Sequence, residues 1–396
     1  MSEWQTFCLK DLGKIVGGAT PSTNNPKNYG NKIAWITPKD LSTLQGRYIK
    51  KGSRSISRLG FKSCSCVLLP KHAILFSSRA PIGYVAIAKK RLCTNQGFKS
   101  IIPNKKIYFE FLYYLLKYHK DNISNIGGGT TFKEVSGATL GLFKVKIPPT
   151  YYEQQKIART LSILDQKIEN NHKINELLHK ILELIYEQYF VRFDFLDENN
   201  KPYQTSGGKM KFSKELNRLI PSGWSVRFLN HKIVSTYQPK TISKTLLNDS
   251  YSYSVYGGGG IIGRFTEYNH EQSEFIISCR GQCGISYLTL PKSWITGNAM
   301  VIRPTKSYTS KTYLYHTIKK YKLTNYITGS VQPQITRQNL STMPILIPKR
   351  KTLNKWNNIS GLLWNLIHNN MQSTQTLTVL RDFLLPLLLK QQVKPQ

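Results

Sequence analysis

Apolar residues recur at helical spacing in a long stretch near the middle of the chain. They fall three or four positions apart from Ile157 to Ile168 and, after a polar gap, again from Ile174 to Ile185, and neither Pro nor Gly interrupts the stretch. Upstream, Thr150 is followed three positions later by Glu153, which is the arrangement of a capping box at a helix start. The pattern therefore predicts a long amphipathic helix with coiled-coil character over residues 149–193.

A second stretch with similar spacing runs from Trp356 to Leu388. It predicts another long helix within residues 349–396, which Pro386 should kink or end early. Because each amphipathic helix needs a covering face, we expect the two to pair as an antiparallel coiled coil with pseudo-two-fold symmetry. Two asparagine pairs near the helix midpoints either form a polar seam that fixes the register or face solvent: Asn170-Asn171 and Asn369-Asn370.

Shorter apolar runs bounded by Gly, Pro and Asn fill most of the remaining chain, and they predict strands with one helix in each half. The expected fold class is α+β, with two tandem mixed α/β domains separated by the two helices. The first domain covers residues 1–148, and residues 194–348 hold a polar linker, to about residue 223, and the second domain. The clearest strands are Ile33–Ile36, Ala73–Phe76, Tyr84–Ala88, Lys144–Ile147, Phe275–Ser278 and Ala299–Ile302, and the shorter helices are Phe109–Tyr118 and Thr312–Lys319.

The two mixed domains repeat one another at an offset of about 200 residues. Ser77-Ser78-Arg79 matches Ser278-Cys279-Arg280, and the segment from Gly129 to Pro148 matches the segment from Gly329 to Pro348. A repeat this long is a duplicated domain, since solenoid repeats have periods of about 20–50 residues. Two similar but non-identical surfaces suit a protein that reads two things at once.

The charge balance points to a polyanionic ligand. Lys and Arg number 56 against 21 Asp and Glu, which gives a formal net charge of +35. Nucleic acid is the leading partner, because neutralising phosphates releases counterions. An acidic protein or a membrane surface comes second, and a general compositional bias toward Lys explains part of the excess.

The sequence lacks the motifs that several classes of enzyme require. We find no P-loop, no His-Glu-x-x-His, no amino-methyltransferase motif and no convincing carboxylate cluster for a nuclease metal. The Gly-rich runs do not open a βαβ unit, so a dinucleotide site is not expected. Six cysteines without zinc spacing are expected to be free thiols. No apolar run reaches membrane length and no signal peptide is evident, so we expect a cytoplasmic binder without catalysis, cofactor or metal.

Side chains with paired donors and acceptors read bases, whereas Lys contacts phosphates. Such side chains cluster in the Gly-rich and polar loops. Arg79 and Arg280 occupy matching positions, where each either contacts DNA or pins a loop. The Tyr-rich run at 251–256 either stacks on bases or packs in the core. The candidates are Lys39, Arg79, Gln96, Thr130, Thr131 and Lys133 in the first copy, and Tyr256, Arg264, Arg280, Gln282, Asn298, Gln332, Gln334 and Arg337 in the second.

The order of motifs along essentially the whole chain resembles the specificity subunit of type I restriction–modification enzymes. The resemblance rests on Ile147-Pro-Pro followed by Tyr152-Glu-Gln-Gln-Lys-Ile157, on Ser206-Gly-Gly-Lys-Met210 with Ile220-Pro-Ser-Gly-Trp224, on Tyr256-Gly-Gly-Gly-Gly-Ile-Ile-Gly263, and on Asn95-Gln-Gly-Phe98. The second long helix departs from the pattern, because Lys349–Lys355 lacks the Glu-Gln of the first.

The resemblance implies that each domain is a target recognition domain for one half of a split site in double-stranded DNA. The helices would set the spacing and dock two methyltransferase (modification) subunits, and a motor-nuclease (restriction) subunit would join for cleavage. S-adenosylmethionine, ATP and Mg would bind those partners. Two alternatives stay open: a fused enzyme with its own catalysis, and a basic scaffold, such as an anti-restriction-related binder, for RNA or acidic proteins.

Overall fold

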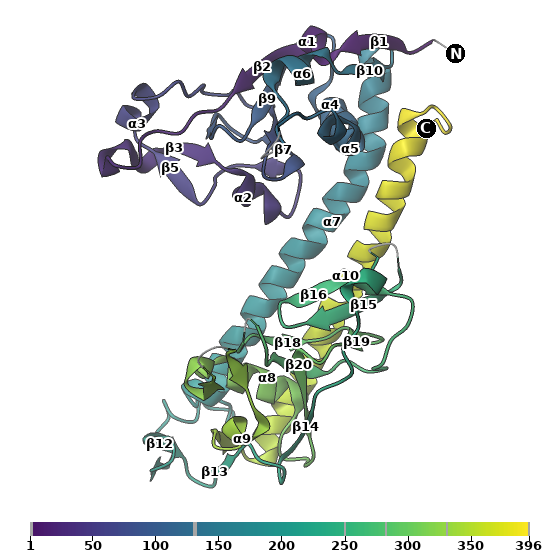
Figure 1. Ribbon diagram of the computed structural model, residues 1–396. Coiled ribbons are helices and arrows are strands. Elements are labelled where there is room, and N and C mark those ends of the chain that lie inside the picture. Colours follow the sequence, from purple (N-terminus) through teal and green to yellow (C-terminus); the bar gives the residue numbers. More distant parts are fainter. Residues whose placement is uncertain (1–2, 130–132, 249–250, 282, 330–331, 395–396) are drawn as a thin grey trace. The chain divides into compact units, whose positions relative to one another are not determined.

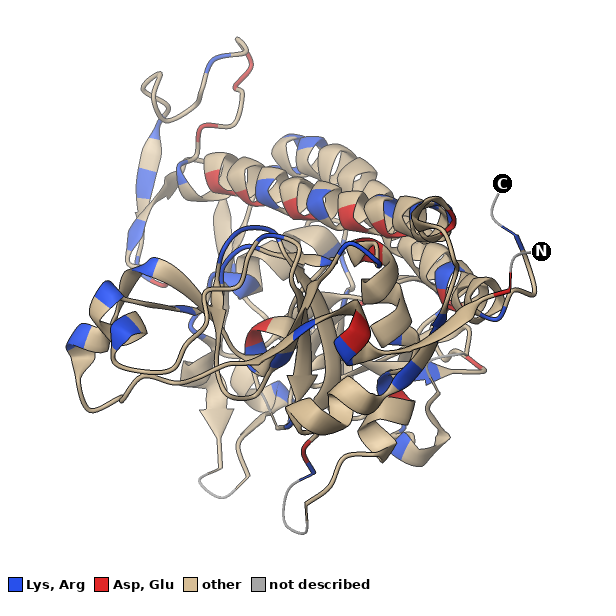
Figure 2. Ribbon diagram, turned by 90° about the horizontal axis from the view of Figure 1, so that it is seen from above, with Lys and Arg blue, Asp and Glu red and all other residues tan. Residues whose placement is uncertain are grey.

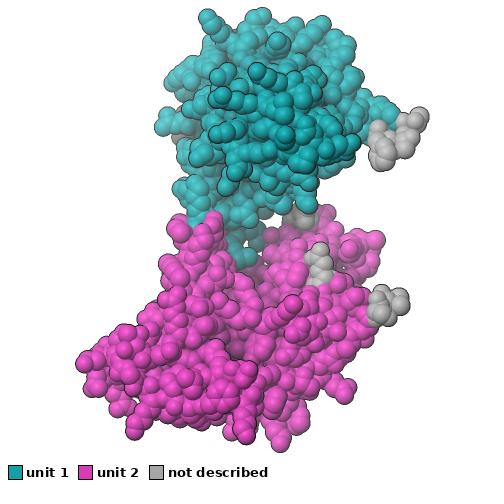
Figure 3. All heavy atoms as spheres, turned by 90° about the vertical axis from the view of Figure 1, so that its left-hand side faces the viewer, with its two compact units in different colours: residues 1–173, 371–396 teal, residues 174–370 magenta. Residues whose placement is uncertain are grey.

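The computed structural model (Figure 1) describes residues 3–129, 133–248, 251–281, 283–329 and 332–394. The chain divides into two compact units. Unit 1 comprises residues 1–173 and 371–396, and unit 2 comprises residues 174–370 (Figure 3). Each unit contains one copy of the repeat together with part of both long helices, as expected for two tandem mixed α/β domains.

The first long helix, α7, spans Tyr151–Tyr186 and continues as a π-helical turn over Glu187–Val191. Its start has the predicted capping box: the hydroxyl of Thr150 accepts a hydrogen bond from the backbone N–H of Glu153 at 3.2 Å and donates to that residue's carboxylate at 3.1 Å. The second, α10, spans Arg350–Leu389. It therefore ends three residues beyond Pro386, within one turn of the residue that lacks a backbone N–H.

The two helices run antiparallel within each unit, because rising numbers on α7 meet falling numbers on α10. In unit 1 the amide of Asn171 donates to the hydroxyl of Thr374 at 3.2 Å. In unit 2 the amide of Asn370 donates to the side-chain oxygen of Asn175 at 2.9 Å. One member of each predicted asparagine pair thus lies in a polar seam, whereas Asn170 and Asn369 are exposed.

Unit 1 is built on a five-stranded sheet of order β2-β9-β6-β7-β4. Alternate residues of its central strand β6 enter two different cores. Phe76 packs with residues of helix α4, whereas Leu75 packs with Phe98 in a second cluster on the opposite face. The strands are β2 (Gly13–Gly17), β4 (Tyr48–Ile49), β6 (Ile74–Ser78), β7 (Ile82–Ala88) and β9 (Lys99–Pro103), and α4 spans Phe109–Tyr118.

Smaller elements complete unit 1. The strands β5-β3-β8 form a three-stranded sheet, and β1 pairs antiparallel with β10. The strands are β1 (Gln5–Cys8), β3 (Tyr29–Ile36), β5 (Arg54–Ile56), β8 (Cys93–Thr94) and β10 (Lys144–Ile147), and the helices are α1 (Leu9–Leu12), α2 (Pro38–Ser42), α3 (Arg58–Lys62), α5 (Lys120–Asn125) and α6 (Gly137–Leu142), with a 3₁₀ turn η1 (Pro26–Asn28).

Unit 2 repeats the plan with a four-stranded sheet of order β14-β20-β17-β18 and a three-stranded sheet of order β16-β15-β19. Helix α8 (Lys311–Lys319) takes the place of α4, and β13 pairs with β23 as β1 pairs with β10. The strands are β13 (Ser225–Phe228), β14 (Val234–Tyr237), β15 (Tyr253–Gly257), β16 (Gly260–Phe265), β17 (Phe275–Ser278), β18 (Ser286–Leu288), β19 (Trp294–Ile295), β20 (Ala299–Pro304), β21 (Ile327–Thr328), β22 (Gln334–Ile335) and β23 (Pro344–Ile347), with helix α9 (Arg337–Leu340) and 3₁₀ turns η3 (Lys244–Leu246) and η4 (Leu323–Tyr326).

The segment 194–223 is more ordered than its polar composition predicts. It contains an antiparallel hairpin of β11 (Met210–Ser213) and β12 (Arg218–Pro221). The predicted polar connection therefore contains a pair of strands that the sequence pattern did not predict. Phe212 and Leu219 are exposed, whereas Ile220 is buried, so the alternation that predicts a half-buried strand is short and weak.

A buried ion cluster attaches the first domain to the helices within unit 1. The guanidinium of Arg47, which follows the α2 loop, lies 3.1 Å from Glu110 of α4 and 3.3 Å from Glu169 of α7. Arg381 of α10 contacts Asp165 at 2.8 Å, and Arg47 lies 3.9 Å from the same carboxylate. Burial disfavours the charge on Arg47, but these surrounding acids outweigh it and raise the pKa of Arg47 above its ordinary value.

Candidate nucleic-acid interface

The loop that carries Arg79 is held by two backbone hydrogen bonds at the end of β6. The N–H of Ser78 donates to the carbonyl of Gly97 at 2.8 Å, and the N–H of Val135 donates to the carbonyl of Ser78 at 3.0 Å. These bonds bring together three segments: the end of β6, the turn before β9, and the loop before α6. The position before Arg79 therefore joins the loops that carry Arg79, Gln96 and Lys133.

The second copy has the same two hydrogen bonds. The N–H of Cys279 donates to the carbonyl of Asn298 at 3.0 Å, and the N–H of Ile335 donates to the carbonyl of Cys279 at 3.1 Å. A Cβ at Gly258 would lie only 2.8 Å from the carbonyl oxygen of Arg280, so the Gly-rich turn between β15 and β16 approaches this loop closely. The repeat seen in the sequence thus extends to individual backbone bonds around Arg79 and Arg280.

The side chains around the two arginines differ. Arg79 lies 3.6 Å from the carboxylate of Glu134, which also binds the ammonium of Lys99 at 3.1 Å. Arg280 forms a β-bridge with Gln334, the equivalent of Glu134, and is exposed. An anion approaching the first loop meets two cations that share one carboxylate, whereas the second loop offers a neutral amide beside its arginine.

The other candidates of the first copy lie at the same edge of unit 1. Lys39, on α2, is exposed, and the ring of Pro38 beside it is 3.0 Å from a Cβ built at Gly97. Gln96 is exposed in the turn before β9 and is hydrogen-bonded to Thr20. Lys133 is exposed next to Glu134. Thr130 and Thr131 lie outside the described residues.

In unit 2 the exposed candidates belong to the matching loops. Asn298 is exposed in the turn before β20, and its backbone carbonyl binds Cys279. Gln332 and Gln334 are exposed in the loop before α9, and Arg337 is exposed in the first turn of that helix. Gln282 lies outside the described residues. The structure therefore gathers Arg280, Asn298 and Gln334 from segments far apart in the sequence.

Two candidates have structural roles instead. Tyr256 is only 3% exposed, packs in the core of the second domain, and accepts a hydrogen bond from the N–H of Leu290 at 3.0 Å. It cannot stack on a base, so its inclusion was wrong. The guanidinium of Arg264 donates to the carbonyls of Tyr251 and Ser252, both at 2.6 Å. These bonds occupy Arg264 in pinning the edge of the β15–β16 hairpin.

Sequence reasoning missed residues that shape these loops. Lys99 follows the Asn95-Gln-Gly-Phe98 motif by one residue and forms part of the cation pair around Glu134. Gln238 donates from its amide to the thiol of Cys279 at 2.9 Å and to the carbonyl of Gly297 at 3.3 Å. The motif was a signal for Lys99, whereas nothing in the sequence near Gln238 marks its contact.

The charge is concentrated on the two repeated domains. Residues 1–148 hold 24 Lys and Arg against 6 Asp and Glu, and residues 224–348 hold 14 against 4. Figure 2 shows red acidic positions recurring along a long helix, and α7 alone contains Glu153, Asp165, Glu169, Glu176 and Glu183. Each domain therefore presents a strong positive field, while α7 is nearly balanced.

Metal and membrane sites were also sought in the described parts of the chain. These residues contain no group of three or more His, Cys, Asp or Glu side chains placed to hold a metal. No helix among them is both long and apolar enough to cross a bilayer. All six cysteines are free thiols, of which Cys66, Cys93 and Cys279 are buried. What the described residues assemble at the loop edges is thus a set of cations and amides, which are the groups that pair with phosphates and base edges in DNA complexes.

Comparisons with known proteins agree with this geometry. The family described as the type I restriction modification DNA specificity domain matches residues 1–180 and 221–356. The type I restriction enzyme MjaIX specificity subunit of Methanocaldococcus jannaschii is 32% identical, over 97% of this chain and 92% of that protein. The HindI specificity subunit of Haemophilus influenzae is 30% identical over 46% of this chain and 40% of its own length.

Solved structures show the same fold. The crystal structure of a type I restriction-modification system S subunit from M. genitalium superposes with a TM-score of 0.60. The match covers 97% of this chain and 96% of that one, at 18% sequence identity. At this identity the likeness concerns the fold, which is the arrangement of two repeated domains and two long helices.

Proposed function

The chain belongs to the type I restriction modification DNA specificity family, and on that premise we propose that each unit reads one half of a split target in double-stranded DNA. The observation that carries the proposal is the pair of equivalent arginines, Arg79 and Arg280. Arg79 follows Ser78 and Arg280 follows Cys279, and equivalent pairs of backbone hydrogen bonds hold Ser78 and Cys279. The side chains of the neighbouring loops differ between the two copies. Loops of one construction with different donors and acceptors suit two surfaces that recognise different bases.

In the second copy, base recognition falls to Arg280, Asn298 and Gln334. An arginine donates two hydrogen bonds to the O6 and N7 atoms of guanine, and Asn or Gln bonds the N6 and N7 atoms of adenine. All three side chains are exposed and come from segments joined at Cys279. In the first copy Arg79 and Gln96 have these roles, with Glu134 limiting the positive charge.

Phosphate contacts fall to the exposed lysines around each loop edge. Lys39 and Lys133 lie beside Gln96 and Arg79 in unit 1, and Arg337 lies at the start of α9 in unit 2. Such contacts position the protein without reading sequence. We expect the logarithm of the affinity to fall with the logarithm of salt concentration with a slope of about −0.9 per neutralised phosphate.

The helices act as the spacer between the two reading domains. α7 contains 36 residues, which corresponds to about 54 Å at a rise of about 1.5 Å per residue. The helix is continuous across the boundary between the units at Lys173, and α10 crosses it again at Asn370. A continuous helix fixes a length better than a loop does, so the spacer between the half-sites is constant.

The helices also dock partner subunits, because they leave large apolar side chains uncovered. Lone exposed apolar residues are ordinary, but a concentration on two helices indicates an interaction surface. In unit 1 these residues are Ile163, Val379, Leu380 and Phe383, and in unit 2 they are Ile174, Leu177, Ile181, Leu184, Leu362 and Leu366. Their partners are two methyltransferase subunits and, for cleavage, a motor-nuclease subunit.

Catalysis and its cofactors belong to those partners. S-adenosylmethionine, ATP and Mg would bind the methyltransferase and motor subunits, and the complex would act in the cytoplasm on the DNA of the cell. This chain contributes recognition: it holds cations and amides at two loop edges and supplies the helices on which the catalytic subunits assemble.

Selection from a random DNA duplex library by the purified full chain tests the proposal. We expect two short blocks of fixed sequence separated by a constant number of unspecified base pairs. Retention of duplexes without any enriched sequence, or of RNA as strongly as of duplex DNA, would instead support a basic scaffold.

A further inference from the structure

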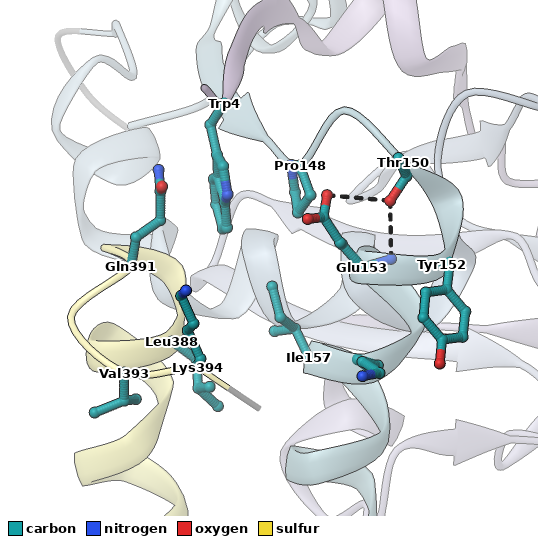
Figure 4. A pocket seen from close by; sticks show the side chains of 11 residues that line it. Trp4, Pro148, Thr150, Tyr152, Glu153, Ile157, Leu388, Gln391, Val393 and Lys394 are labelled. Carbon is teal, nitrogen blue, oxygen red and sulfur yellow. Dashed lines mark hydrogen bonds between the residues drawn. The ribbon is translucent and has the colours of Figure 1, made fainter. Parts of the chain in front are cut away.

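A cavity of about 440 Å³ opens in unit 1 where the first turns of α7 meet the end of α10. Figure 4 shows the indole of Trp4 standing between Gln391 on one side and Ile157 on the other. The walls are largely apolar and come from Trp4, Pro148, Tyr152, Ile157, Leu388 and Val393. The Trp4 ring is half-buried and packs edge-on against Phe111. This cavity is separate from the loop edges that carry Arg79.

The equivalent place in unit 2 is filled. Trp224 directly precedes β13, as Trp4 directly precedes β1, and the two strand pairs have the same register: Gln5 faces Ile147, and Ser225 faces Ile347. Yet Trp224 is only 1% exposed. The same fold position is therefore open in one unit and closed in the other.

Two phenylalanines of the chain itself close the site in unit 2. The ring of Phe195 stacks on Trp224 with centroids 5.1 Å apart, and the ring of Phe193 meets it edge-on at 5.5 Å. Such aromatic pairs contribute about 0.5–1.5 kcal/mol each beyond their buried area. The segment after α7 thus supplies an aromatic cover for the tryptophan.

In unit 1 the matching residues 384–396 supply no aromatic side chain to the cavity. Residues 384–396 contain none, and the side chains that reach the Trp4 cavity from this segment are those of Leu388, Gln391, Val393 and Lys394. The duplicated sequence therefore keeps the tryptophan and the strand register but not the aromatic cover.

Charged residues are a second feature of the two sites. In unit 2 the two phenylalanines flank Asp194, whose carboxylate accepts hydrogen bonds from the backbone and the hydroxyl of Thr205, both at 2.8 Å. At the cavity in unit 1, Lys156 and Lys394 lie among the lining residues together with Glu153, whose carboxylate accepts a hydrogen bond from the hydroxyl of Thr150. A carboxylate between two aromatic side chains would meet these ammonium groups.

We propose that the Trp4 cavity receives a peptide segment with two aromatic side chains flanking an acidic one, carried by a partner subunit that docks on the helices. The identity of that partner rests on the proposed function, whereas the chemistry of the segment rests on the unit 2 site. The segment would stack one ring on Trp4, as Phe195 stacks on Trp224, and place its carboxylate near Lys156 and Lys394.

A fluorescently labelled synthetic peptide with the sequence of residues 191–197 serves as the probe for the full chain. We expect saturable binding, and a peptide with Phe193→Ala and Phe195→Ala, which has the same charge, should not bind. In the protein, Val393→Asp should weaken binding by about ten-fold or more, because it places an unpaired carboxylate against the rings. Tyr152→Ala should weaken it as well. Tyr151→Ala, one residue along the same helix and outside the cavity lining, is the matched control and should change it less than about two-fold.

Equal binding of both peptides, or equal binding by the wild-type chain and Val393→Asp, would overturn the assignment of the cavity. Because the peptide assay contains no DNA, these outcomes leave the duplex selection unaffected, and failure of that selection leaves the peptide result intact. A second assay measures retention of a co-expressed methyltransferase subunit. We expect Val393→Asp to reduce retention and Tyr151→Ala to preserve it, and equal retention by both would overturn the identity of the partner.

Discussion

Arg79 lies 3.6 Å from the carboxylate of Glu134, whereas at the matching loop Gln334 bridges the backbone of Arg280. The two loops are otherwise held by the same backbone hydrogen bonds. The equivalent residues Glu134 and Gln334 are a carboxylate in the first copy and an amide in the second. The charge of Arg79 is therefore partly neutralised, whereas the described surroundings of Arg280 include a neutral amide.

Replacing Glu134 by Gln should strengthen binding to DNA. The change removes a negative charge that faces incoming phosphates and that pairs with both Arg79 and Lys99. We expect an increase in affinity of about three- to ten-fold at low salt, which shrinks as salt screens the charges. Fluorescence anisotropy with a labelled duplex measures it. Glu176→Gln, at an exposed carboxylate paired with Lys180 on α7, is the control, and an equal gain there would show that only net charge matters.

Replacing Arg280 by Ala should relax recognition at one position of one half-site. A bidentate arginine–guanine contact contributes about 1–3 kcal/mol of discrimination, which corresponds to about 5- to 150-fold between right and wrong bases. Competition between duplexes that differ at single positions measures this ratio. Arg227→Ala, at an exposed arginine on β13 that stacks on Tyr308, should leave it unchanged. A uniform loss of affinity for all sequences would identify Arg280 as a phosphate contact.

Replacing Asp165 by Ala should destabilise unit 1 strongly. The Asp165 carboxylate binds Arg381 at 2.8 Å and the hydroxyl of Tyr114 at 2.6 Å, and its side chain is only 5% exposed. Removing one partner of a buried ion cluster costs about 3–5 kcal/mol, because a buried charge loses its compensation. Thermal unfolding should show a loss of about 10 °C. Lys180→Ala, which breaks an exposed pair on the same helix, should shift the midpoint by far less, and similar shifts would contradict a buried cluster.

Unit 2 should lose stability as the pH falls below about 6.5. Burial lowers the pKa of His316 to about 3 and the pKa of His368 to about 4. In the unfolded chain both imidazoles bind a proton near pH 6.5, so the unfolded state takes up protons first. The stabilising contribution is complete above that pH, is lost as the pH falls, and levels off below the folded pKa values.

Denaturant titrations at two pH values measure this loss. Between pH 7.5 and pH 5 each histidine should account for about 1–2 kcal/mol. The double variant His316→Gln and His368→Gln should have a flatter pH profile, even though it starts from a lower stability. A profile as steep as that of the wild-type chain would assign the pH dependence to other groups.

The long-range plan of the fold was predictable because its signals are periodic. Apolar spacing between Ile157 and Ile185 indicated α7, whose capping box at Thr150 and Glu153 is present. The duplicated Ser-x-Arg segments indicated that Arg79 and Arg280 are equivalent, and the backbone hydrogen bonds confirm this. The end of α10 was less predictable, since the helix continues for three residues beyond Pro386 before it ends at Leu389.

Details that depend on tertiary pairing could not be predicted. Tyr256 lies in a Gly-rich run that is typical of a loop, but its strand pairs on both sides with β16 and β19, which buries the ring. The β11–β12 hairpin was missed because Phe212 and Leu219 are exposed while Ile220 is buried, which leaves only a weak alternating pattern. The ion cluster at Arg47 joins groups up to 334 positions apart, as the numbers of Arg47 and Arg381 show, and no local pattern marks such a contact.

The central claim is that the two domains read their half-sites independently. Exchange of residues 224–348 for the equivalent segment of another specificity subunit, followed by sequencing of methylated sites in cells that carry the complete complex, tests it most directly. We expect one half of the modified target to change while the other half and the spacer length stay the same. A change in both halves, or in neither, would contradict it.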